Sequence, residues 1–106
     1  MEQYYAYVNL SKKEYFHPHD FGVGAKAIEQ FDSSGPNILT FLLIKTDGQG
    51  GGDISKGIET SFLGHWAGDS ISIIGDYDFF KLYFLAVKEY KNIGKEAFAQ
   101  YLSATN

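Results

Sequence analysis

Glycines and acidic residues gather in one part of the chain. Residues 47–78 hold eight of the twelve glycines and six of the thirteen acids, with a single lysine among them. Glycine packs no side chain and loses much backbone entropy on folding, so a core-building segment would not concentrate it. The composition is typical of tight turns, or of a site where backbone groups and carboxylates meet a ligand.

The densest part of this stretch, residues 48–53, could bind an anion. Gly50, Gly51 and Gly52 follow one another, and successive glycine N–H groups can point into one concavity. No Gly-Lys-Ser or Gly-Lys-Thr follows, so the segment is not a P-loop, and its spacing does not match a dinucleotide-binding fingerprint. The alternative is a connecting loop without a ligand.

The carboxylates of the same stretch could hold a metal ion. Five aspartates could supply hard oxygen ligands to Ca²⁺ or Mg²⁺: Asp47, Asp53, Asp69, Asp76 and Asp78. Residues 47–53 do not match the EF-hand loop. Asp69 and Asp76 lie in predicted turns, where aspartate commonly bonds its own backbone, and this is the competing interpretation. A divalent cation, which could bridge a phosphate to this acidic surface, is the one cofactor these residues suggest.

Two histidines flank Pro18, which favours extended backbone at this point. In a strand His17 and His19 would point to the same face and could approach one ligand or ion together. His19 or His65 could also act as a general base near neutral pH. The competing interpretation is a loop in which one imidazole packs and forms hydrogen bonds.

Trp66 lies close to Gly64 and Gly68 and could stack on a planar ring, or it could anchor the core at the end of a hairpin. No nucleophile elbow surrounds a serine and no glycosidase frame is recognisable, so no catalytic residue is assigned. The candidate ligand-binding residues are His17, His19, Gly50, Gly51, Gly52, Asp53, Trp66 and Asp69.

Length and composition limit the class of protein to which this chain can belong. A chain of 106 residues predicts a single domain over residues 1–106, and the lack of cysteine excludes disulfides and fits a cytoplasmic protein. The net charge of −4 without a basic stripe argues against nucleic acid. The N-terminus lacks the features of a signal peptide, and the longest apolar run, residues 82–87, is too short to span a membrane.

The elements that would position these residues can be predicted in outline. Residues 3–10 favour a strand, residues 11–22 a polar–aromatic connection and residues 25–31 a short helix. After a break at residues 32–36, Asn37 could cap a buried helix over residues 38–45, although a strand is an alternative there.

The second half of the chain predicts a hairpin and two helices. Residues 60–66 and 70–75 favour its strands, with residues 67–69 as the turn. Residues 80–87 favour a helix over a strand, and residues 95–102 a terminal helix. The predicted fold class is α+β, with a small antiparallel sheet packed with two to four short helices.

Several short motifs, taken as an ordered set, resemble a family of small uncharacterised proteins of bacteria and their phages. They are Lys12-Lys13-Glu14-Tyr15, His17-Pro18-His19, Gly50-Gly51-Gly52-Asp53, Trp66-Ala67-Gly68-Asp69 and Gly75-Asp76-Tyr77-Asp78. The resemblance covers roughly residues 9–102. It implies that these motifs belong to one architecture, and it implies no catalytic role.

The sequence favours a binding protein. Residues 17–19, 48–53 and 66–69 would form one rim that binds a small polar ligand or a partner protein, and the acidic charge would suit a basic partner. The alternative is a metal-assisted hydrolase or phosphate-handling enzyme, with a histidine as base and Asp53, Asp69 and Asp76 holding the ion. A third possibility is a homo-oligomer that buries an aromatic surface.

Overall fold

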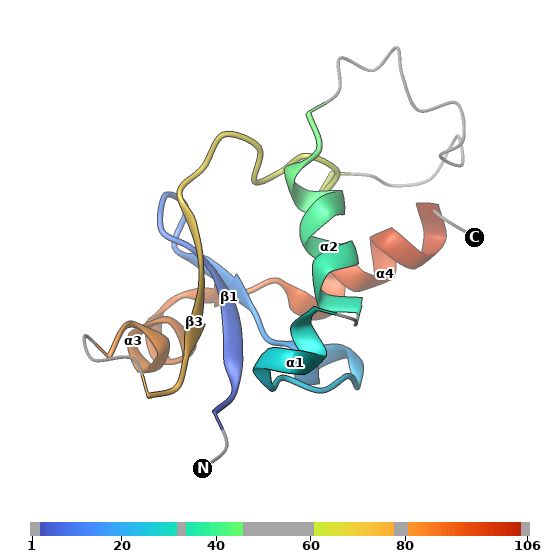
Figure 1. Ribbon diagram of the computed structural model, residues 1–106. Helices are drawn as coiled ribbons and strands as arrows, with labels where there is room; N and C mark the ends of the chain where they lie inside the picture. The colour runs from blue at the N-terminus through green and yellow to red at the C-terminus, as the bar shows by residue number, and fades with distance from the viewer. Residues whose placement is uncertain (1–2, 32–33, 46–60, 78–80, 105–106) are drawn as a thin grey trace.

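The computed structural model describes residues 3–31, 34–45, 61–77 and 81–104. In chain order, the elements are β1 (Tyr5–Asn9), β2 (Glu14–Phe16), the 3-10 helix η1 (Pro18–Phe21), α1 (Ala27–Gln30), α2 (Ser34–Leu43), β3 (Ile71–Gly75), α3 (Leu82–Glu89), β4 (Lys91–Asn92) and α4 (Gly94–Ala104). Strands and helices share one fold (Figure 1), which confirms the predicted α+β class.

The four strands form one sheet in the order β3-β1-β2-β4. The strands β3, β1 and β2 pair in antiparallel fashion. The short strand β4 pairs with β2 in parallel, so the sheet is mixed. Helices α1, α2 and α3 and the strand β3 lie between β2 and β4 in the chain, and a parallel pairing generally needs a long crossover connection of this kind.

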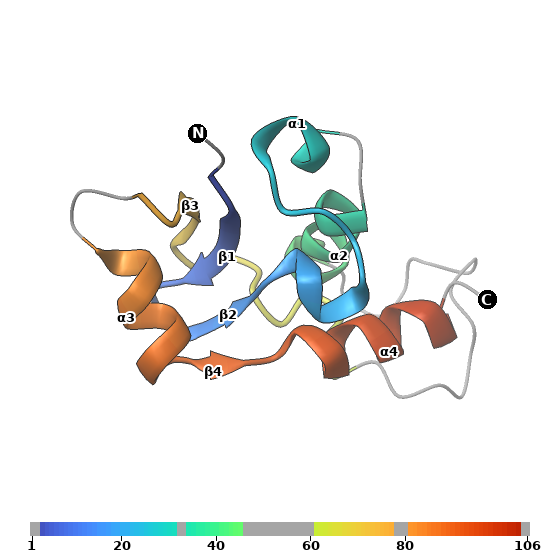
Figure 2. The same ribbon diagram turned by 90° about the horizontal axis from the view of Figure 1, so that it is seen from below.

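Helices cover both faces of the sheet. Helix α3 lies on one side of the strands, and α1, α2 and α4 lie on the other (Figures 1 and 2). We call these sides the α3 face and the helical face. Alternation along β1 sends Tyr5 and Tyr7 to the helical face, and Ala6 and Val8 to the α3 face.

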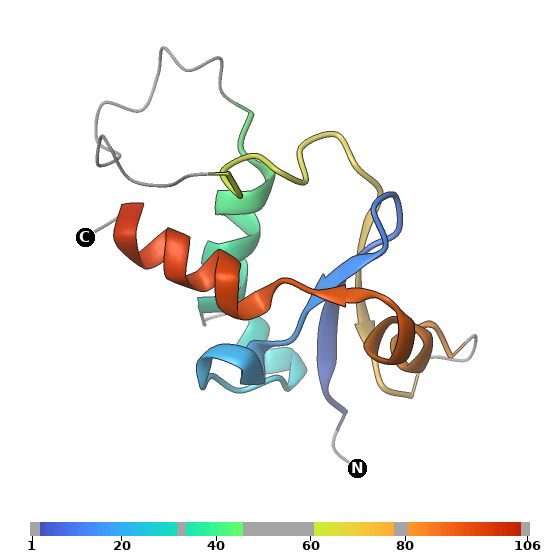
Figure 3. The same cartoon turned by 180° about the vertical axis from the view of Figure 1, so that it is seen from behind.

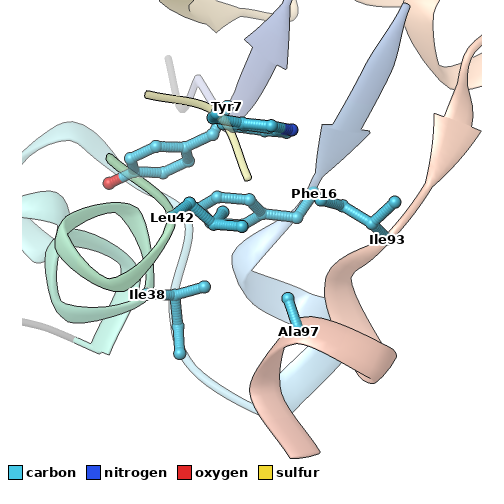
Figure 4. Packing of buried hydrophobic residues seen from close by; sticks show 7 residues of the cluster. Tyr7, Phe16, Ile38, Leu42, Ile93 and Ala97 are labelled. Carbon is cyan, nitrogen blue, oxygen red and sulfur yellow. The ribbon is translucent and has the colours of Figure 1, made fainter. Parts of the chain in front are cut away.

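The larger core lies on the helical face and is built from aromatic stacking. The ring of Phe16 stacks on Tyr7 with centroids 4.5 Å apart and on Trp66 at 5.8 Å. Ile38 and Leu42 of α2 and Ile93 and Ala97 close this cluster, which is fully buried (Figure 4). The sheet, α2 and the start of α4 are therefore held together by one apolar cluster.

The α3 face has a smaller core. The helix predicted over residues 80–87 is confirmed from Leu82 onward and extends to Glu89, while residue 80 lies outside the described residues. Ala86 is fully buried against the strands, and Leu82, Tyr83 and Tyr90 pack beside it at helical spacing. Seen from behind, α3 lies beside the strands, and the chain continues from it into β4 at the edge of the sheet (Figure 3). None of the helices in the described ranges has both the length and the apolar character needed to cross a bilayer.

The prediction that residues 60–66 pair with residues 70–75 in a hairpin is wrong in the part that the structure describes. Residues 61–69 form turns, and β3 pairs with β1 instead. Gly64 and Gly68 have φ values of +71° and +83°, which glycine adopts without strain. The N–H groups of Gly64 and Trp66 donate to the carbonyls of Phe41 and Leu42 at 2.9 Å each. These turns thus satisfy the C-terminal carbonyls of α2.

Two other local predictions need correction. The connection predicted over residues 11–22 contains β2 and η1, because Tyr15 and Phe16 each bury against one face of the sheet. Helix α2 begins at Ser34, so Asn37 lies inside the helix instead of capping it. Pro36 falls in the first turn, where its missing N–H would have no partner within the helix.

Candidate functional site

The predicted site residues fall into separate places. Gly50, Gly51, Gly52 and Asp53 lie outside the described residues. His17 follows the end of β2, whereas Asp69 bonds the other end of the β1–β2 hairpin through Asn9 and Lys12. At roughly 3.3 Å per strand residue, these two ends are about 10 Å apart along β2. The structure therefore brings His17 and His19 together, and Trp66 and Asp69 form a second group.

His17 caps the helix η1 and ties it to α3. Its Nδ1 accepts the backbone N–H of His19 at 3.1 Å, and its backbone N–H donates to the carboxylate of Asp20 at 2.9 Å. The neutral ring therefore carries its proton on Nε2, which lies 2.9 Å from the hydroxyl oxygen of Tyr83. The imidazole serves as a structural link between two elements.

The environment of His17 disfavours its charged form. Burial lowers the pKa of His17 below its ordinary value of 6.5, and the neighbouring His19 lowers it further. The carboxylates of Asp20 and Asp76 act in the opposite direction without reversing the shift. The ring of His19 lies 4.6 Å from that of His17 and 5.6 Å from that of Tyr4, measured between centroids.

Trp66 is a core residue and cannot stack on a ligand. Its ring is fully buried, and its Nε1–H donates to Oε1 of Glu14 at 2.8 Å. The same carboxylate lies 3.0 Å from Nε2 of His65, whose side chain is partly exposed. The structure thus supports the second interpretation of Trp66, as an anchor of the core, and corrects its place in the ligand-binding set.

Asp69 is engaged by the β1–β2 hairpin. Its Oδ2 accepts hydrogen bonds from Nζ of Lys12 at 2.5 Å and from Nδ2 of the buried Asn9 at 2.8 Å. These two hydrogen bonds hold the pKa of Asp69 below its ordinary value. Asn9 in turn accepts the backbone N–H of Lys12 at 2.7 Å. The Asp69 carboxylate therefore links the segment just before β3 to the β1–β2 hairpin.

The two carboxylates of the proposed metal site that the structure describes, Asp69 and Asp76, do not meet. Asp69 precedes β3 and Asp76 follows it, so they lie roughly 20 Å apart along a strand that rises roughly 3.3 Å per residue. Asp53 lies outside the described residues. Within the ranges that the structure describes, no three His, Cys, Asp or Glu side chains are grouped closely enough to hold a metal ion.

An apolar hollow opens on the helical face beside β3. Its volume is about 320 Å³, and it is lined by Tyr5, Tyr7, Ala27, Gln30, Phe31, Leu39 and Ile73. Phe31 is 83% exposed and Ile73 is 47% exposed, so large apolar side chains form an open rim. Pockets of this kind bind the apolar parts of ligands.

One polar pair lies in the wall of the apolar hollow. The hydroxyl of Tyr7 donates to Oε1 of Gln30 at 2.9 Å, and Nε2 of Gln30 donates to the carbonyls of Gly24 and Lys26. Burial raises the pKa of Tyr7, so its hydroxyl stays protonated near neutral pH. This pair fixes α1 against β1, which keeps the hollow open between them.

The sequence predictions missed the hollow, although its signal is in the sequence. Residues 25–31 were expected to form a helix with Ala27, Ile28 and Phe31 on one face. Helix α1 is only four residues long, and both Ile28 within it and Phe31 at its C-terminal end remain exposed. A very short helix with large apolar residues that it cannot bury is the pattern that points to a surface for another molecule.

Searches of protein-family models, curated proteins and solved structures found no match to this chain. The resemblance to small bacterial and phage proteins therefore remains a prediction.

Proposed function

We propose that this protein is a binding protein and that its binding site is the apolar hollow. The observation that carries the proposal is the combination of a cavity of about 320 Å³ with a lining that is almost entirely apolar and a rim of exposed Phe31 and Ile73. A site of this kind takes an aromatic or aliphatic group and holds it by burial.

The chemistry of the hollow changes the expected ligand. The sequence pointed to a small polar ligand or a partner protein at a rim of histidine, glycine and aspartate. The apolar lining instead suits an apolar group, either of a small molecule or of a partner protein. Tyr7 and Gln30 are already hydrogen-bonded to each other, so they would orient a ligand in the hollow more than add to its affinity.

A titration with indole, followed by amide chemical shifts, tests the proposal. We expect the largest shifts at Tyr5, Tyr7 and Ile73, because these residues line the hollow on the sheet side. Replacing the exposed Phe31 with serine should weaken indole binding about fivefold or more, since this corresponds to about 1 kcal/mol of lost contact. Phe31→Ser should fold normally because its side chain is 83% exposed.

Phe84→Ser is the matched control. Phe84 is also an exposed phenylalanine, at 57%, but it lies on α3, which covers the opposite face of the sheet. Its replacement should leave indole binding unchanged. Shifts centred on α3, or equal losses in both variants, would contradict the assignment of the site to the hollow.

The metal-assisted hydrolase has less support. Asp69 is held by Lys12 and Asn9, and Asp76 lies at the far end of β3. The one observation in its favour is the contact of His65 with Glu14, because a carboxylate can orient a histidine for general-base chemistry. Calorimetric titration of the protein with Mg²⁺, Mn²⁺, Ca²⁺ and Zn²⁺ separates the two functions.

A further inference from the structure

The strand β3 is the outermost strand of the sheet on the side of the apolar hollow. It pairs with β1 along one edge, and no other strand in the described ranges pairs with its second edge. Such an edge presents backbone groups that can accept a further strand.

The hydrogen bonds between β1 and β3 show which groups point outward. The N–H of Leu10 donates to the carbonyl of Ser70, and the N–H of Asp76 donates to the carbonyl of Tyr4. In an antiparallel pair, bonded and non-bonded residue pairs alternate. The backbone N–H and C=O groups of Ile71, Ile73 and Gly75 therefore point away from β1. Gly75 is buried, so the open part of this outer edge consists of Ile71 and Ile73.

Within β3 itself, this edge carries no charged residue, proline or bulge. Natural edge strands commonly carry charged residues, proline or a bulge, which prevent unwanted association. The strand β3 has the sequence Ile-Ser-Ile-Ile-Gly, and its register with β1 runs without interruption over all five residues. An uncharged, regular edge of this kind is suited to being used by a partner.

The edge and the hollow share Ile73. Its backbone points outward, and its side chain lies on the helical face, where it forms part of the hollow's lining. Residues directly opposite each other in a strand pair place their side chains on the same face. The residue of an added strand that pairs with Ile73 would therefore direct its side chain over Ile73 toward the hollow.

The charge around this edge favours a basic partner. Residues 61–77 contain Asp69 and Asp76 but no lysine or arginine, and the whole chain has a net charge of −4. Asp69 is already paired with Lys12, whereas Asp76 follows β3 directly at the end of the edge. A lysine or arginine in the added strand would find a carboxylate at Asp76.

We infer that a partner protein contributes an extended, basic segment, which adds to β3 as an outer strand and places a large apolar side chain in the hollow. This inference rests on the proposed function and specifies the partner class. Backbone hydrogen bonds to residues 71 and 73 would supply affinity, and the hollow would select the side chain.

Selection from a displayed library of random nine-residue peptides on the immobilised full chain tests the inference. We expect enriched peptides to carry a large apolar residue flanked by lysine or arginine. A synthetic copy of the strongest peptide should slow amide hydrogen exchange at Ile71 and Ile73 at least tenfold. Exchange at Ile74, which already bonds β1, should change less.

Two variants alter the edge. Because Ile73 also lines the hollow, the hydrogen-exchange measurement is what distinguishes pairing at the edge from binding in the hollow. Ile73→Pro removes an outward N–H while leaving the bonds to β1 in place, and it should weaken the peptide at least tenfold. Asp76→Asn keeps an acceptor for the N–H of Tyr4 but removes the charge, and it should weaken a basic peptide severalfold. The exchange measurement on the wild-type chain decides the question even where Ile73→Pro does not fold.

Three outcomes would overturn the inference. The first is that no peptide is enriched. The second is that an enriched peptide leaves amide exchange at residues 71 and 73 unchanged. The third is that these amides exchange slowly without peptide in a protein that sediments as a dimer, which would assign the edge to a second copy. If indole still binds the hollow in any of these cases, the proposed function stands and only the peptide assignment fails.

Discussion

Individual polar side chains connect segments that lie far apart in the sequence. Glu14 accepts the indole N–H of Trp66, Asn9 donates to Asp69, and Gln30 accepts the hydroxyl of Tyr7. Among the described residues, every buried side-chain nitrogen and oxygen has a hydrogen-bond partner. Leaving one such group unpaired costs about 1–3 kcal/mol, so these contacts select one arrangement of the chain.

His17 should make the stability of the protein depend on pH. The folded state holds the pKa of His17 below 6.5, so the unfolded chain takes up a proton first as the pH falls. The contribution of His17 is therefore complete above about pH 7 and is lost as the pH falls from 6.5 through the folded pKa. Urea unfolding at several pH values between 5 and 8 measures this loss.

His17→Asn isolates the contribution of this one histidine. Asparagine can still accept the N–H of His19 as a helix cap, but it does not titrate. The variant should lose less stability than the wild type between pH 7 and pH 5. Identical pH dependence in the two proteins would show that His17 is not the group responsible.

Turns and short elements set the shape of the sheet and of the hollow. Lys13 in the β1–β2 hairpin and Lys81 before α3 have φ values of +56° and +59°, which are unfavourable for residues other than glycine. The carbonyl of Lys13 accepts the N–H of Lys91 at 3.0 Å, so the strained turn helps to bring β4 to the sheet.

Lys13→Gly should stabilise the protein. A left-handed backbone costs a residue with a side chain about 1–2 kcal/mol, while glycine adds about 0.5–1 kcal/mol of unfolded-state entropy. The expected net gain is therefore about 0.5–1 kcal/mol in the free energy of unfolding, measured with urea. Lys88→Gly in α3 is the control and should destabilise by about 1 kcal/mol. A loss of stability in Lys13→Gly would contradict the strain argument.

The whole molecule is organised by one sheet with a core on each face. Tyr7 and Phe16 enter the larger core, and the neighbouring Val8 and Tyr15 enter the smaller one. The same strands therefore belong to both cores, and loss of packing on one face removes support from the other. The apolar hollow lies where α1 and α2 leave part of the helical face uncovered.

Leu42→Ala should destabilise the whole molecule in one cooperative transition. Leu42 is fully buried in the larger core, and such truncations cost about 2–5 kcal/mol. Trp66 fluorescence reports the helical face, and far-UV circular dichroism reports all elements, so the two unfolding curves should coincide. Leu102→Ala, at a residue that is 50% exposed, should cost less than 1 kcal/mol. Separate transitions would mean that the two cores unfold independently.

The sequence by itself determined the elements whose signal is local. The strand β1 was predicted from its aromatic residues and lack of breakers, and the terminal helix α4 from apolar residues on one face. For α3 the apolar content allowed a helix or a strand, and the helix was favoured. Turns at residues 67–69 and 76–77 followed from glycine and aspartate. The α+β class followed from these elements together.

Only the tertiary structure decided which elements pair and which residues meet. The strand β3 pairs with β1, which lies more than sixty positions away in the chain. Trp66 is buried because Phe16 stacks on its ring and Glu14 accepts the hydrogen bond of its indole N–H. The hollow depends on α1 being too short to cover Tyr5 and Ile73, which lie on different strands. Periodicity within one segment carries no information on such contacts, because they depend on how distant segments share one buried volume.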